Sequence, residues 1–137
     1  MEKLAELYHD LYDGGVLLYS GCYGLDGNCD AVIVSDGKEH YGLFLDVGKI
    51  HTFLQEKMAI SHEWGHWVTG ATYSLDADEI TIRKQEARAD RAQIRRLIPR
   101  SELQAAIDDH RDFYELVELF GVTEAFMRKA LECYFPS

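Results

Sequence analysis

Long apolar segments are missing from this sequence of 137 residues. No stretch approaches the roughly 18 consecutive apolar residues that a membrane-spanning helix needs. The first ten residues, MEKLAELYHD, carry acidic side chains where a secretion signal would have a basic start and then an apolar segment. We therefore expect a cytoplasmic protein with no membrane partner.

Cysteine and positive charge are also scarce. The three cysteines, Cys22, Cys29 and Cys133, are odd in number and lack CxxC spacing, which predicts reduced thiols rather than a disulfide framework. The formal net charge is −10, and such a balance repels phosphate backbones. We expect no direct contact with nucleic acid.

The hydrophobic content is ordinary for a globular protein. Hydrophobic residues make up 47% of the chain and aromatic residues 12%, which predicts a packed core rather than disorder. The length suits one domain, or a small catalytic unit with a helical appendage, because single domains most often have about 100 to 150 residues.

The first third of the chain reads as a short helix followed by strands. Residues 2–11 place leucines at helical spacing, and a turn at 13–15 follows. Segments 15–20, 31–35 and 40–46 are rich in β-formers and are separated by Gly, Asn and Asp clusters. The Asp36-Gly37 pair between the last two predicts a hairpin.

The remainder reads as helices. Thr52 with Gln55 fits a capping box, so a helix should begin near residue 53 and end at Gly70. A second long helix should span about 78–98, since Pro99 cannot continue a helix interior. Ser101 with Gln104 is a candidate cap for a third helix. Two further apolar stripes, separated by Gly121 and a Thr123 cap, predict two helices in a helix-turn-helix-like arrangement.

The segment HEWGH, residues 62–66, has the residue types and spacing of a metal-binding catalytic site. His62 and His66 are four residues apart, so on a helix both imidazoles point toward the same side and can reach one metal ion. Glu63 is rotated by about 100°, which places it beside the metal as a general base. A chance match to HExxH is expected about 0.02 times in a chain of this composition. Gly65 weakens a helix interior, which indicates a close approach by another backbone or by substrate.

A catalytic zinc site usually has three protein ligands and an open position for water, so a third ligand must come from another element. Glu86 is the best candidate, because it lies 20 residues after His66, enough for a loop and a returning helix. Asp90 follows on the same helical face and could orient a ligand histidine through its far nitrogen. The rivals for the third position are Asp76, Asp78 and Glu79, in the probable loop.

HEWGH, together with Glu86-Ala87-Arg88-Ala89-Asp90 and Leu97-Ile98-Pro99, resembles the ImmA/IrrE family of metallopeptidases, and the tail LVELFGVTEAFMRKAL resembles the C-terminal helices of phage and mobile-element members. The resemblance covers roughly residues 50–134. It implies a gluzincin-like centre with one Zn²⁺ per chain on His62, His66 and Glu86, and Glu63 as base. It also implies a cytoplasmic endopeptidase that cleaves a cognate transcriptional repressor.

The chain departs from the family pattern on the second helix, where Ala92-Gln93 replaces a common Phe-Ala, and at Trp64, which replaces a common Leu. These changes bear on core packing and substrate preference more than on metal binding. Because His62 is retained where some relatives lose it, an active enzyme is favoured.

We expect an α+β fold in which a small β-meander packs on the helix pair that carries the zinc site. Residues 1–100 would form the metallopeptidase domain, and 101–137 a helix-turn-helix-like appendage on the same core. Two other functions stay open: a non-catalytic zinc protein that binds a repressor, and a regulator that uses its C-terminal helices.

Two further features are left open. Residues 83–100 form a basic run along the second long helix. Such a run is most often a solvated face, although it could dock an acidic partner. Tyr41, His51 and Tyr73 could each stabilise a developing oxyanion, but aromatic side chains in such places are more often structural.

Overall fold

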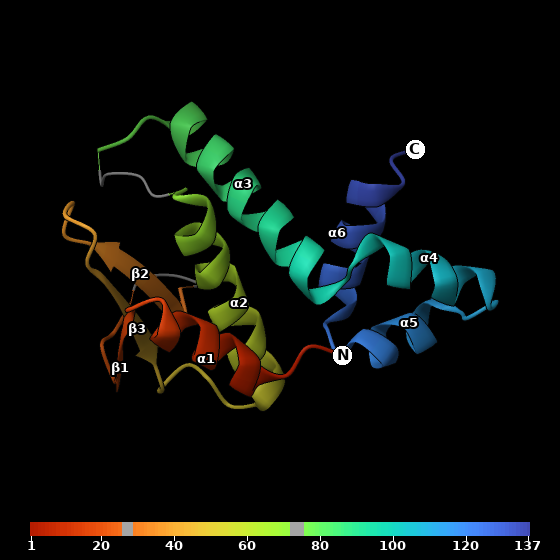
Figure 1. Cartoon of the computed structure of the whole chain (residues 1–137), viewed down its shortest axis with the longest axis horizontal. Coiled ribbons are helices and arrows are strands. Elements are labelled where there is room, and N and C mark those ends of the chain that lie inside the picture. Colours follow the sequence, from red (N-terminus) through yellow and green to blue (C-terminus); the bar gives the residue numbers. More distant parts are fainter. Residues whose placement is uncertain (26–28, 72–75) are drawn as a thin grey trace.

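The structure is a computed structural model that describes residues 1–25, 29–71 and 76–137. Within these ranges the chain forms a three-stranded sheet and six helices, which confirms the α+β class. None of the helices in the described ranges is both long enough and apolar enough to cross a membrane. The elements, drawn in Figure 1, are α1 (Leu4–Asp13), β1 (Leu17–Gly21), β2 (Ala31–Ser35), β3 (Tyr41–Asp46), α2 (Phe53–Thr69), α3 (Glu79–Leu97), α4 (Arg100–Asp108), α5 (Phe113–Phe120) and α6 (Glu124–Tyr134).

The sheet is mixed, so the expected meander is wrong. β2 and β3 form the predicted antiparallel hairpin, with Ile33 opposite Leu43, but β1 runs parallel to β3 and the strand order is β1-β3-β2. The buried Asp46 at the end of β3 accepts a hydrogen bond from Leu25 N (3.1 Å), which ties residue 25 to the end of β3.

Helices α1 and α2 bury one face of this sheet. Leu7 and Leu11 of α1, Leu43 of β3 and Ile60 of α2 are fully buried in one hydrophobic cluster. Both tryptophans of α2, Trp64 and Trp67, pack against it.

The ends of α2 follow from its capping residues. Thr52 accepts a hydrogen bond from Gln55 N (3.0 Å), and Gly70 ends the helix with φ 64° in the left-handed region that favours glycine. The reciprocal half of the predicted capping box is shifted by one residue, since the Gln55 side chain accepts from His51 N (2.8 Å).

Helix α3 packs along α2 at very short range. A Cβ built on Gly65 would lie 2.4 Å from the carbonyl oxygen of Ala89 in α3, so a larger residue there would force the two helices apart. The close approach expected from Gly65 is therefore one to another backbone. Gln93, which is 3% exposed, also ties the pair together by donating to Met58 O (3.0 Å) and Ser61 Oγ (2.8 Å).

The three C-terminal helices gather around the end of α3 (Figure 1) and share a second hydrophobic cluster with it. Gly121 and Thr123 end α5 and begin α6 as predicted. Ser101 is not a cap: α4 begins at Arg100, with Pro99 at the capping position and no side-chain cap hydrogen bond.

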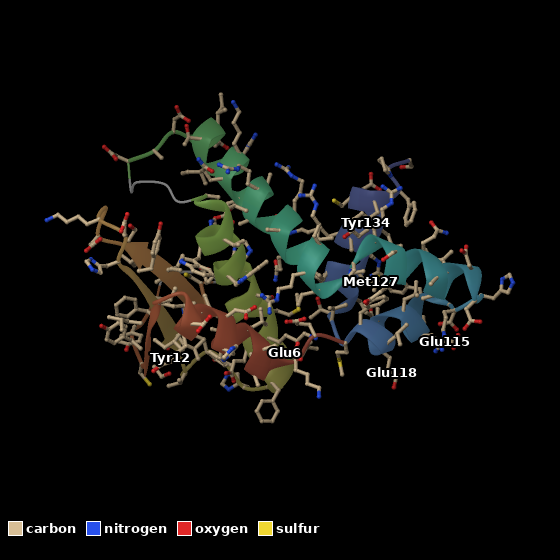
Figure 2. All side chains as sticks on the ribbon, in the orientation of Figure 1. Glu6, Tyr12, Glu115, Glu118, Met127 and Tyr134 are labelled. Atoms are coloured by element: carbon tan, nitrogen blue, oxygen red, sulfur yellow. The ribbon has the colours of Figure 1, made fainter. Side chains whose placement is uncertain are left out.

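Hydrogen bonds from the side chains of Tyr134 and Lys57 help to fasten these helices to the rest of the chain. Tyr134 near the end of α6 donates to Ile98 O (2.7 Å), where α3 gives way to α4 (Figure 2). The buried Lys57 of α2 donates to Phe120 O (3.2 Å) and Gly121 O (3.0 Å), the carbonyl end of α5. A cation placed at a helix C-terminus also interacts favourably with the helix dipole.

The basic run on α3 is not one uniform surface. Arg96 contacts Glu2 and Asp10 near the N-terminus and lies 4.7 Å over the Trp64 ring, so it is a structural anchor. Arg83 pairs with Glu79 one turn away.

Candidate metal centre

His62, His66 and Glu86 come together where α2 faces α3. Their ligand atoms all lie within 4.8 Å of one another. The histidines are one turn apart on α2, with ring centroids separated by 4.8 Å, and Glu86 reaches across from α3. The group depends on the short distance between the two helices that Gly65 allows.

The Glu86 carboxylate bridges the two imidazoles. Its Oε2 lies 3.0 Å from His62 Nε2, and its Oε1 lies 3.1 Å from His66 Nε2. Three ligand atoms held about 2.1 Å from one tetrahedral ion lie roughly 3.4 Å apart, so small side-chain adjustments suffice to hold a metal. Two imidazole nitrogens and one carboxylate are also a donor set that catalytic zinc uses. The residues present therefore fit a metal ion.

The far nitrogens of both rings have acceptors. His66 Nδ1 donates to Ala71 O (2.5 Å), and a carbonyl can only accept, so in the neutral ring Nε2 keeps its lone pair for a metal. His62 Nδ1 lies 3.3 Å from Asp90 Oδ1, the contact expected for an orienting carboxylate.

The charge around His62 favours its protonated form when no metal is present. Burial lowers the pKa of His62, but the hydrogen bonds to Asp90 and Glu86 outweigh it and raise the pKa to about 10. Burial likewise opposes a charge on His66, yet its contacts with Glu86 and Ala71 raise the pKa. A metal ion would replace these protons, because it binds the same nitrogens.

Glu63 lies on the side of α2 that faces the sheet. It is 8% exposed, and its Oε2 accepts a hydrogen bond from Ile33 N (3.0 Å) on β2, a strand at the edge of the sheet. Burial raises the pKa of Glu63, while the neighbouring His62 and His66 lower it. These interactions place the carboxylate beside the histidines and make it a stronger base than an exposed glutamate.

The rival acids have other roles. Asp78 caps the start of α3 by accepting from Thr81 N (2.7 Å), and Glu79 pairs with Arg83 (2.6 Å). Asp76 is not part of the three-residue group either.

Two of the three oxyanion candidates lie in structural surroundings. His51 lies just before the cap of α2, and Tyr41 packs against the sheet cluster. Tyr73 falls outside the described residues.

Sequence reasoning missed the contribution of α6. Lys129 of α6 lies 3.0 Å from Asp90 Oδ2, so the carboxylate that contacts His62 is itself paired with the last helix. In sequence Lys129 is only one lysine on an amphipathic stripe, and no local pattern indicates its partner. Asp90 has a lowered pKa: burial opposes its charge, and the His62 and Lys129 contacts more than offset this.

Searches against protein-family models, curated proteins and solved structures find no match to this chain. What the centre does must therefore be inferred from its own side chains. The described residues provide a partly buried group of His62, His66 and Glu86 that could bind a metal, and its two histidines belong to an HExxH sequence.

Proposed function

We propose that this protein is a zinc-dependent endopeptidase in which His62, His66 and Glu86 hold the metal and Glu63 is the general base. One observation carries the proposal: both histidines of HExxH and a glutamate 20 residues downstream converge on one group, with a buried glutamate beside it. A purely structural cluster of charges would not require this order of residues.

The donor set favours a catalytic ion over a structural one. Structural zinc is usually held by four protein ligands, often cysteines, whereas hydrolytic zinc keeps three protein ligands and an open position. The group in the described residues has three members and no cysteine. A zinc ion held there would act as a Lewis acid toward a scissile carbonyl and a water molecule.

Glu63 would move the proton. Its carboxylate takes a proton from the attacking water and returns it to the leaving nitrogen, which requires a base whose pKa lies above that of an ordinary glutamate. Burial provides such a shift. The hydrogen bond from Ile33 N fixes the direction of the carboxylate, so less reorganisation is needed during the reaction.

We further propose that the substrate is a protein, specifically a transcriptional repressor of a prophage or mobile element, cleaved in the cytoplasm. This step is supported by the resemblance of HEWGH, of residues 86–90 and of the C-terminal helices to the ImmA/IrrE family. The non-catalytic alternative leaves Glu63 with only the structural role of accepting a hydrogen bond from Ile33 N.

The test is hydrolysis by the purified, zinc-loaded protein. Unfolded casein and a candidate repressor are incubated with it, with and without the chelator 1,10-phenanthroline, and the products are analysed by mass spectrometry. We expect internal cleavage that the chelator stops and added zinc restores. The His66→Ala variant should be inactive, because it loses a ligand. If the zinc-loaded protein leaves both substrates intact, the proposed activity is wrong.

A further inference from the structure

A pocket of about 420 Å³ lies beside the candidate metal centre, between α2, α3 and α6. Its size is within the range of sites that bind small ligands or short peptide segments. The residues around it are Met58 and His62 of α2, Glu86, Asp90 and Gln93 of α3, and Thr123, Ala125, Phe126 and Lys129 at the start of α6.

The pocket wall is suited to an uncharged, apolar group. Met58, Ala125 and Phe126 provide carbon surface. The two charged lining residues that are not candidate ligands, Asp90 and Lys129, neutralise each other at 3.0 Å.

The other polar members of this wall are also engaged. The Gln93 amide donates to Met58 O (3.0 Å) and Ser61 Oγ (2.8 Å), and Thr123 accepts from Phe126 N (3.1 Å) to cap α6. A charged side chain in the pocket would lose its hydration without gaining a free partner.

The pocket ends at the candidate metal centre. His62 and Glu86, two of the three potential ligands, form part of its lining. A peptide whose carbonyl lies at the metal would therefore place a neighbouring side chain in the pocket.

Helix α6 is held firmly enough to act as a wall. Its Lys129 pairs with Asp90, and the segment before it is fixed by the bonds from Lys57 to Phe120 O and Gly121 O. Phe126 is itself buried in the C-terminal cluster.

We propose that the start of α6 forms one wall of a specificity pocket that takes a large apolar side chain, of leucine or phenylalanine size, next to the scissile bond. The identity of the ligand as a peptide rests on the proposed function. The C-terminal helices are then part of the substrate site rather than an appendage.

The test uses two hydroxamic acids that bind zinc through the same group and differ in their tails: acetohydroxamic acid and 4-methylpentanohydroxamic acid. Their affinities for the zinc-loaded protein are measured by calorimetry. We expect the longer acid to bind about tenfold to a hundredfold more tightly, since its tail is comparable to a leucine side chain.

The variant that separates the pocket from the metal is Ala125→Trp, which adds a large side chain at an exposed position of α6 beside the pocket. Ala125→Trp should reduce the ratio of the two affinities, longer acid over acetohydroxamic acid, at least tenfold. The affinity for acetohydroxamic acid itself should stay unchanged. The smaller change Ala125→Leu should reduce it less. Ala105→Trp, at an exposed position of α4 away from the pocket, is the matched control and should keep the advantage.

Equal affinities of the two acids for the parent protein would contradict the proposed specificity pocket. So would an unchanged preference for the longer acid in Ala125→Trp, or failure of both acids to bind. The casein assay tests the enzyme separately. Tail-dependent binding without proteolysis would mean that the proposed function fails and the pocket stands. Proteolysis with tail-independent binding would mean the reverse.

Discussion

Gly65 of α2 lies so close to Ala89 of α3 that a Cβ on the glycine would come within 2.4 Å of the alanine carbonyl oxygen. The contact lies next to His66 in sequence and, on the other helix, between Glu86 and Asp90. The distance between the two helices at this point therefore sets how far the carboxylates must reach to meet the histidines.

Gly65→Ala should weaken both the fold and the metal centre. Alanine is the better helix former by about 1 kcal/mol, but overpacking a tight contact typically costs about 1 to 3 kcal/mol, and here the opposing atom is backbone that cannot rotate away. We expect a lower melting temperature and weaker zinc binding, measured by calorimetry and dye competition. A variant that is more stable and binds zinc normally would show that the helices separate without consequence.

Asp90→Asn should reduce zinc affinity by about tenfold to a hundredfold, because a carboxylate that accepts from a ligand histidine fixes the ring and raises its basicity. The variant keeps an oxygen at the Asp90–His62 contact of 3.3 Å but removes its negative charge. Lys129→Gln is the companion variant, since it removes only the second partner of Asp90 and should have a smaller effect. If Asp90→Asn binds zinc as the parent does, Asp90 serves only the ion pair with Lys129.

Zinc binding should release protons at neutral pH. In the metal-free protein the pKa of His62 is about 10, so at pH 7 its ring carries a proton that a metal must displace. Apparent affinity should therefore rise with pH from 7 toward 10. Calorimetry at pH 7 in buffers of different ionisation enthalpy should detect release of at least one proton, and none would contradict the arrangement.

The raised pKa of His62 also predicts that the metal-free protein becomes less stable as pH rises. The folded-state pKa of His62 lies above its usual value of 6.5, so the protonated ring stabilises the fold fully below pH 6.5. That contribution is lost as pH rises through 10. Melting of metal-free protein across this range should show the decline, and His62→Gln should reduce it.

Local signals in the sequence were sufficient for the helices that carry the centre. Thr52 and Gly70 mark the bounds of α2, and Pro99 marks the end of α3, because caps and helix breakers act within one turn. Once both helices are placed, the spacing from His66 is enough to nominate Glu86.

Features that depend on contacts between residues far apart in the sequence could not be predicted from local signals. The parallel pairing of β1 with β3 joins residues about 25 positions apart, such as Leu17 and Gly42, and burial of Gln93 depends on acceptors in α2. The Lys129–Asp90 pair joins residues 39 positions apart. Neither residue type nor periodicity indicates any of these partners.

The C-terminal helices should not bind DNA despite their helix-turn-helix outline. From residue 101 to 137 there are three basic and eight acidic side chains, a net charge of 3 − 8 = −5. Phosphate contacts from basic residues supply most non-specific affinity, and all three are already paired with carboxylates: Arg111 with Asp109, Arg128 with Glu124 and Lys129 with Asp90. Fluorescence anisotropy of the full protein with labelled duplex DNA should show no binding at micromolar concentration. Salt-sensitive binding would favour the regulator alternative.

The most direct test of the central claim is Glu63→Gln, measured for zinc content, thermal melting and cleavage of casein or a repressor beside the parent protein. The amide oxygen can still accept from Ile33 N, and the three metal ligands are untouched, so fold and zinc should be retained. The amide cannot accept and return a proton, and this step typically contributes a factor of about 10² to 10⁴ in rate. Glu79→Gln, on the surface and paired with Arg83, is the matched control and should keep full activity. The account predicts normal zinc content with proteolysis reduced at least a hundredfold. Loss of zinc, or cleavage at the parent rate, would contradict it.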